Sequence, residues 1–172
     1  ELAGTLDATA TISGSSSAPT GQYKVTVKQM TAPQIRDAGL PPVDITLDGR
    51  LEKSRTRLNA TANLGKAGAI TVSGTVPLDT REAIALSAKG RLDTAVANAM
   101  LSTSGRSVSG MVLLDARVSG TRAKPQASGV ATLNGGSFRD SELGTRLDAI
   151  DARITADGDR IVVERLSATT PN

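Results

Sequence analysis

Residues 108–133 read VSGMVLLDARVSGTRAKPQASGVATL, and this stretch decides the fold class. Its even-numbered positions from 108 to 118 are all apolar or glycine, whereas most of its odd-numbered positions are polar, with Met111 and Leu113 as exceptions. Successive side chains of a β-strand point to opposite faces, so this alternation predicts a long two-faced strand. Gly120 ends the strand and Pro125 interrupts it, and Ala127–Leu133 begins a second strand.

The start of the chain repeats this plan at residues 2–27, LAGTLDATATISGSSSAPTGQYKVTV. A shift of 106 residues pairs Gly4 with Gly110, Ala10 with Ala116, Ser13-Gly14 with Ser119-Gly120, Pro19 with Pro125 and Thr26 with Thr132. Farther along, RLNAT at 57–61 returns as RLSAT at 165–169, a shift of 108. We therefore expect one elongated unit over residues 1–172, with two repeats at about 2–64 and 108–169, joined by 65–107, as the open alternative.

Composition excludes several function classes. The chain has no cysteine and no histidine, which rules out a Ser-His-Asp triad, a cysteine nucleophile and most zinc sites. Its net charge of +3 comes from interspersed charges and does not resemble a nucleic-acid footprint. No run approaches the roughly 18 apolar residues of a membrane helix. The chain begins with Glu1 and ends on Asn172, so we expect it to be a fragment of a longer protein.

The remaining candidates for chemistry are better explained as solvated surface. The carboxylate pairs Asp148/Asp151 and Asp157/Asp159 lie around a strand and in a turn. Gly65–Gly68 lacks the lysine and the following helix of a phosphate loop. Arg50, Arg55 and Arg57 on polar strand faces could meet lipid phosphates, but a solvated sheet face is the simpler interpretation. We predict no enzyme activity, no cofactor, no metal and no nucleic-acid partner.

Period-2 alternation predicts about ten strands in all. The first, at 2–13, would be near 40 Å long at about 3.3 Å per residue, about twice the usual strand length. Hairpin turns are expected at Gly14–Ser17, at Lys53–Arg55 and around Asp157-Gly158. The period changes twice, which predicts short helices at 32–38 and, with Asp93 as its N-cap, at 94–101.

Long strands with one aliphatic face admit three architectures. A β-sandwich core normally contains aromatic side chains, yet this chain has only Tyr23 and Phe138. The same scarcity rules out the aromatic girdles of an outer-membrane barrel. The third architecture is one long sheet curled into a trough with its apolar face inward, an open concavity suited to a hydrocarbon chain.

We expect aliphatic side chains at the inward positions of successive strands to line this groove. They are Leu6, Ala8, Ile12, Val25, Val27, Val43, Ile45, Leu47, Leu58, Ile70, Val72, Ile84, Leu86, Val112, Leu114, Val118, Leu133, Ile150, Ile154, Ile161 and Val163.

Residues 70–172 resemble the C-terminal region of the TamB family. The resemblance rests on the spacing of Gly, Pro and apolar positions in 108–133, on Gly135-Gly136 and Gly144, on LDAIDARITADGDRIVVERLSATT at 147–170, and on the short helix before Val108. Residues 1–69 are similar in style and through the internal repeat. The resemblance implies an all-β fold, a long curved sheet folded into an elongated β-taco groove with an aliphatic interior, plus one or two short helices.

The same resemblance implies a periplasmic location in Gram-negative bacteria, within a protein anchored in the inner membrane by a segment absent here. One implied function is a conduit that carries phospholipid acyl chains toward the outer membrane. The alternative is a scaffold that works with a TamA-like outer-membrane barrel protein in the assembly of autotransporters and other client β-barrels. An exposed sheet edge would template client strands in that case.

Overall fold

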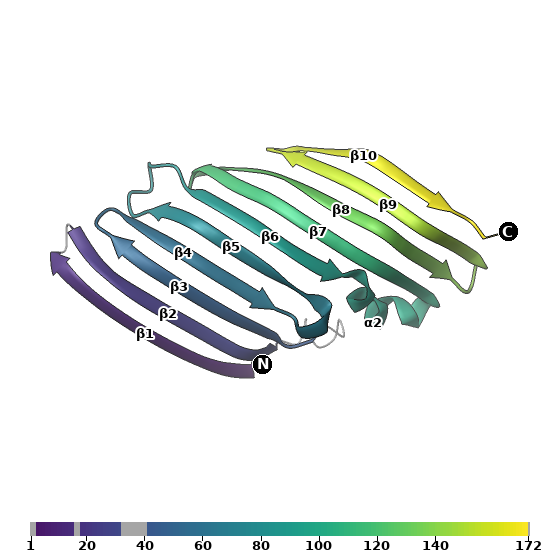
Figure 1. Ribbon diagram of the computed structural model, residues 1–172, viewed down its shortest axis with the longest axis horizontal. Coiled ribbons are helices and arrows are strands. Elements are labelled where there is room, and N and C mark those ends of the chain that lie inside the picture. The colour runs from purple at the N-terminus through teal and green to yellow at the C-terminus, as the bar shows by residue number, and fades with distance from the viewer. Residues whose placement is uncertain (1–2, 16–17, 32–40, 172) are drawn as a thin grey trace.

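The computed structural model describes residues 3–15, 18–31 and 41–171, and these form one open, curved, ten-stranded antiparallel sheet (Figure 1). Each strand pairs with the next one in sequence, without a crossover. The strands are β1 (Ala3–Ser15), β2 (Ala18–Thr31), β3 (Val43–Glu52), β4 (Arg55–Asn63), β5 (Gly68–Pro77), β6 (Ala85–Asp93), β7 (Arg106–Thr121), β8 (Lys124–Asp140), β9 (Thr145–Asp157) and β10 (Arg160–Thr169). The predicted fold class, a long curved sheet of about ten strands, is confirmed.

The sheet has one apolar face and one polar face because the alternation stays in register from strand to strand. One row of paired residues crosses all ten strands through Ala8, Val25, Leu47, Ala60, Val72, Ala88, Ala116, Gly129, Ala156 and Ile161. The row beside it on the same face is Leu6, Val27, Ile45, Ala62, Ile70, Gly90, Leu114, Ala131, Ile154 and Val163. These rows and their neighbours of the same parity are called the apolar face below.

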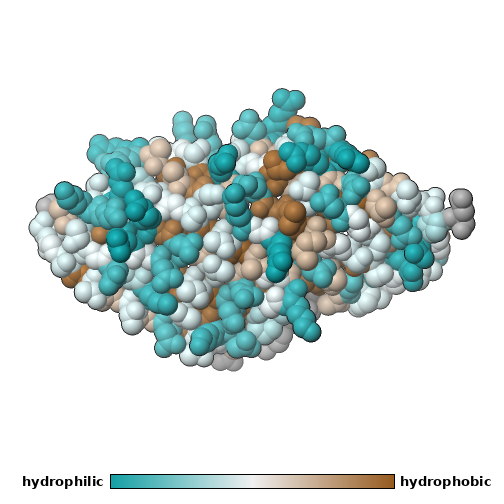
Figure 2. Space-filling view, in the orientation of Figure 1, coloured by the Kyte–Doolittle hydropathy of each residue, from teal (hydrophilic) through white to brown (hydrophobic). Residues whose placement is uncertain are grey.

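The opposite, polar face carries rows of hydrophilic residues. One of them runs through Thr9, Lys24, Asp48, Asn59, Ser73, Ser87, Arg117, Ser128, Asp157 and Arg160. Hydrophilic side chains spread across most of the width of the face seen in Figure 2, with hydrophobic patches between them. Leu113 and Met111, the two exceptions to the alternation, belong to the polar face and are 47% and 37% exposed.

No second layer covers the apolar face within the described residues. Ala67 is the only buried hydrophobic residue among the described residues. The chain exposes 11118 Å² of accessible surface, about 1.4 times the roughly 7,900 Å² of a compact monomer of 17.6 kDa. A packed two-sheet sandwich is therefore excluded.

Side chains of the helical segment between β6 and β7 cover the part of β7 that β6 does not reach. The segment consists of a 3-10 turn (Thr94–Ala97), helix α2 (Asn98–Leu101) and a second 3-10 turn (Ser102–Ser104). The Asn98 side chain accepts a hydrogen bond from the Val108 N–H (2.7 Å) and donates one to the Val108 carbonyl (2.9 Å), as a neighbouring strand would. This contact protects a strand edge that is otherwise open to pairing.

The expected helix at 94–101 is helical throughout, although only its last turn is α-helix. Asp93 is its N-cap as predicted, because its carboxylate accepts a hydrogen bond from the Ala95 N–H at 2.9 Å. The helix expected at 32–38 lies outside the described residues. A further 3-10 turn at Gly65–Ala67 joins β4 to β5.

The β1–β2 and β7–β8 hairpins have matching registers. Gly14 and Gly120 each lie opposite a proline, one residue pair before the turn, and both have positive φ (94° and 80°). Gly4 and Gly110 both lie at a register shift near the other end of the hairpin, with φ of 146° and 135°. All four positions follow the 106-residue shift and support the two-repeat division, which stays a prediction.

The second hairpin of each proposed repeat, β3–β4 and β9–β10, matches less well. Hairpins β3–β4 and β9–β10 both close with two-residue turns, at Lys53-Ser54 and at Gly158-Asp159. However, Arg57 of RLNAT lies two residues into β4, whereas Arg165 of RLSAT lies five residues into β10. The two five-residue motifs therefore do not occupy equivalent positions, and any duplication is clearest in the first hairpin of each half.

Candidate functional site

The residues predicted to line a lipid groove lie together on the apolar face. Twenty of them are strand residues of the inward parity. Ile84 immediately precedes β6, where its N–H donates a hydrogen bond to the Gly120 carbonyl at 2.8 Å. The alternation thus placed these side chains on a common surface, whereas their role in binding lipid stays a prediction.

Exposure of this surface is greatest at the two outer strands. Leu6 and Ile12 of β1 are 67% and 65% exposed, and Ile161 and Leu166 of β10 are 73% and 70% exposed. Residues of the inner strands, such as Val72, are half-buried by their neighbours in the sheet. Isolated exposed aliphatic residues are ordinary, whereas large contiguous apolar faces are uncommon on soluble monomers.

Tyr23 lies on the apolar face and occupies the space beside Gly49. A Cβ added to Gly49 would lie 2.0 Å from the Tyr23 ring, so only glycine allows the ring to lie flat across β3. The Tyr23 hydroxyl hydrogen-bonds the Thr56 hydroxyl at 2.9 Å. Because the ring lies flat against the sheet, the Tyr23 side chain protrudes little from the apolar face.

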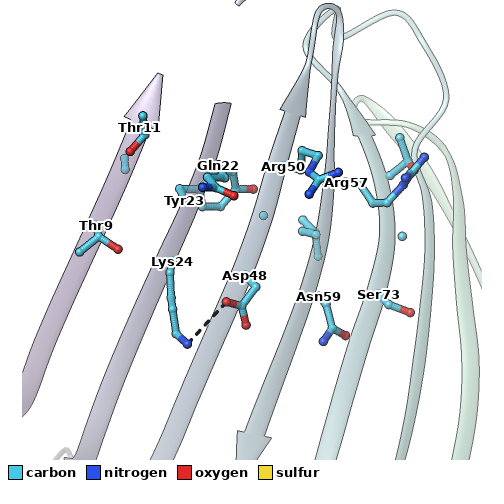
Figure 3. Close-up of a pocket in the computed structure, with 15 residues that line it drawn as sticks. Thr9, Thr11, Gln22, Tyr23, Lys24, Asp48, Arg50, Arg57, Asn59 and Ser73 are labelled. Carbon is cyan, nitrogen blue, oxygen red and sulfur yellow. Dashed lines mark ion pairs between the residues drawn. The ribbon is translucent and has the colours of Figure 1, made fainter. Parts of the chain in front are cut away.

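A hollow of about 840 Å³ lies on the polar face over strands β1–β5 (Figure 3). The side chains around it come from two polar rows, and its floor is the backbone of the row between them. The polar side chains are Thr9, Thr11, Gln22, Lys24, Asp48, Arg50, Arg57, Asn59, Ser73 and Thr75. We call this feature the polar hollow. The sequence did not predict it, because the alternation assigns each residue to a face of the sheet but does not show where that face is concave.

Charged groups in the polar hollow are weakly paired. Lys24 Nζ lies 3.8 Å from an Asp48 carboxylate oxygen, and Arg57 lies 3.6 Å from a Glu52 carboxylate oxygen. All four side chains are well exposed, so each ion pair contributes at most about 1 kcal/mol. Arg50, by contrast, forms no ion pair with a described residue.

Two of the four carboxylates that the sequence singled out, Asp148 and Asp151, form structural contacts. Arg146 Nε lies 2.8 Å from an Asp148 carboxylate oxygen, and the Asp151 carboxylate accepts a hydrogen bond from the Gly135 N–H at 2.9 Å. Among the described residues, no three His, Cys, Asp or Glu side chains are grouped so as to hold a metal ion. The contacts of Asp148 and Asp151 join neighbouring parts of the sheet. That the chain is not an enzyme stays a prediction.

Asp140 is a buried carboxylate that sequence inspection did not identify. It is 2% exposed and accepts hydrogen bonds from Arg106 Nε at 2.9 Å and from the N–H groups of Glu142 and Leu143 at 3.0 Å. The hydrogen bond from Arg106, followed by those from the backbone, lowers the pKa of Asp140. Its contacts close the β8–β9 turn, so its role is structural.

Comparison with known proteins yields no match to a family model, a curated protein or a solved structure. No helix within the described residues has the length and hydrophobicity to cross a membrane.

Proposed function

We propose that the apolar face binds phospholipid acyl chains and that the chain is part of a TamB-like conduit between the inner and outer membranes. The observation that carries the proposal is the set of apolar rows that cross all ten strands without a polar interruption and that no other described residue covers with a second layer. Each methylene removed from water contributes about 0.8 kcal/mol, so such a face has a strong affinity for hydrocarbon.

The dimensions of the sheet suit this ligand. Ten strands spaced about 4.8 Å apart span roughly 43 Å. An acyl chain fills half of a bilayer core, about 15 Å, so it fits within one apolar row. Toward β6–β9 the central row consists of Ala88, Ala116, Gly129 and Ala156, whose small side chains leave room for a chain to lie along the row.

Mass spectrometry of organic extracts from the purified protein tests the proposal. We expect phospholipid to be recovered in stoichiometric amounts, with little preference for headgroup, because the apolar face contacts only the acyl chains. Recovery of no lipid after purification without detergent, from a protein that is folded by circular dichroism, would contradict the conduit.

A second candidate function is a scaffold for β-barrel assembly with a TamA-like partner in the periplasm. The observation that favours it is that, among the described strands, β1 and β10 each pair with one neighbour only and form the two lateral edges of the sheet (Figure 1). Such edges accept an added strand of a client protein. Proline substitutions at β1 positions whose N–H points away from β2 should abolish client capture and leave bound lipid unchanged.

A further inference from the structure

We propose that the polar hollow binds a phosphoryl group between Arg50 and Arg57. These arginines face each other directly in the β3–β4 register. Like charges placed directly opposite each other destabilise a sheet, since their Cβ atoms lie only about 4.5–5.5 Å apart. Glu52 lies 3.6 Å from Arg57 and offsets part of this repulsion, but it forms no ion pair with Arg50. An anion held between the two guanidinium groups removes the remainder and accepts forked hydrogen bonds from both.

The charge balance around this pair favours an anionic ligand. The polar hollow and the adjoining depression at the β3–β4 turn are lined by five cations, Lys24, Arg50, Lys53, Arg55 and Arg57. Of the described residues, only two anions, Asp48 and Glu52, line the same surface. The excess of three positive charges equals the net charge of the whole chain, +3, so the remainder of the chain is neutral overall.

The neighbours of the arginine pair are suited to the uncharged oxygens of a phosphate-bearing ligand. Gln22 lies opposite Arg50, and Thr75 lies opposite Arg57, so the row is flanked by neutral hydrogen-bonding side chains. In Figure 3 the side chains of Arg50 and Arg57 lie beside each other over the hollow. No carboxylate belongs to this row across β1–β5, which runs Thr11, Gln22, Arg50, Arg57 and Thr75.

The proposed phosphoryl site is independent of acyl-chain binding, because the two surfaces are opposite faces of one sheet. A lipid whose chains lie on the apolar face does not place its headgroup in the polar hollow of the same sheet. The phosphoryl group therefore belongs either to a soluble phosphate or to a headgroup at a membrane surface, and the two sources share the same recognition chemistry.

Binding of inorganic phosphate, measured by calorimetry at low ionic strength, tests the site. A parallel measurement uses phosphatidylcholine vesicles with and without phosphatidic acid. We expect Arg50→Gln together with Arg57→Gln to weaken binding at least tenfold. The charge-matched control is Arg91→Gln with Arg160→Gln, two exposed polar-face arginines on β6 and β10, and it should retain binding within twofold.

Arg50→Gln alone supplies a readout that does not depend on the ligand. Arg50 has no ion-pair partner among the described residues, so this variant should fold and, without phosphate, melt at or above the temperature of the unmodified protein. Binding of free phosphate supports a soluble ligand, and binding of phosphatidic acid vesicles alone supports a headgroup. Equal losses in the double variant and its control, or no binding of either probe by the unmodified protein, would overturn the proposal, while bound lipid on the apolar face reports separately on the conduit.

Discussion

Val112→Arg distinguishes an open apolar face from a packed core. Val112 is half-buried between Leu92 of β6 and Leu133 of β8. In a closed core an unpaired arginine would cost more than about 4 kcal/mol and unfold a protein of ordinary stability. On an uncovered face the guanidinium extends into water, so the cost is the lost burial of about half a valine, roughly 1–1.5 kcal/mol.

The expected result is a folded variant with a lower melting temperature and no bound lipid. For a chain of this size, about 1–1.5 kcal/mol corresponds to a shift of roughly 2–6 °C. Thermal melts followed by circular dichroism measure the shift, and mass spectrometry of organic extracts measures the lipid. Thr46→Arg is the matched control, because Thr46 lies on the polar face between Thr26 and Thr61 and should change neither quantity.

Two results would refute this reasoning in different ways. If Val112→Arg does not fold while Thr46→Arg does, the apolar face is closed by a layer outside the described residues. If Val112→Arg folds and still carries a full complement of lipid, acyl chains do not lie at this position. The scaffold function would gain support in that case.

Three further predictions concern the sheet itself. Gly14→Ala and Gly120→Ala should lower stability by similar amounts, about 1–3 kcal/mol each, since both have positive φ and an added Cβ would lie 2.7 and 2.5 Å from a carbonyl oxygen; unequal losses in urea titrations would argue against the duplication. The pKa of Asp140 is lowered in the folded protein, so its stabilising contribution is complete above its ordinary value of 3.8 and is lost as pH falls through the lower folded-state pKa; Asp140→Asn should flatten the acid limb of stability against pH, and an unchanged limb would contradict this. Asn98→Ala should expose the Val108 backbone groups, and we expect increased aggregation in light scattering with little change in circular dichroism.

The sequence predicted the two faces well because period-2 alternation is a local property of the chain. Strand ends were harder to predict, as β8 illustrates. Alternation predicted a second strand over Ala127–Leu133, yet β8 runs from Lys124 to Asp140. Gly135 has a φ of 62° and lies at a register shift, so the two glycines form a bulge within the strand rather than its end.

Features that depend on how strands far apart in sequence are placed could not be predicted. Arg50 and Arg57 were recognised as polar-face residues, but the polar hollow requires the curvature of five strands together. Asp140 is a single acidic residue near a turn, and its burial depends on Arg106, which lies 34 residues away on β7. No spacing rule connects the two residues before the β7–β8 register is known.

The order of the strands also has a consequence for how this chain acquires its structure. Because every strand pairs only with its neighbours in sequence, loop closure is short and no strand waits for a distant partner. Folding can start at any hairpin and spread one strand at a time, as in a linear repeat protein. A chain that emerges gradually, from a ribosome or through a translocation pore, can therefore add each new strand to a completed edge, and its stability should fall in steps rather than vanish when whole hairpins are removed from one end.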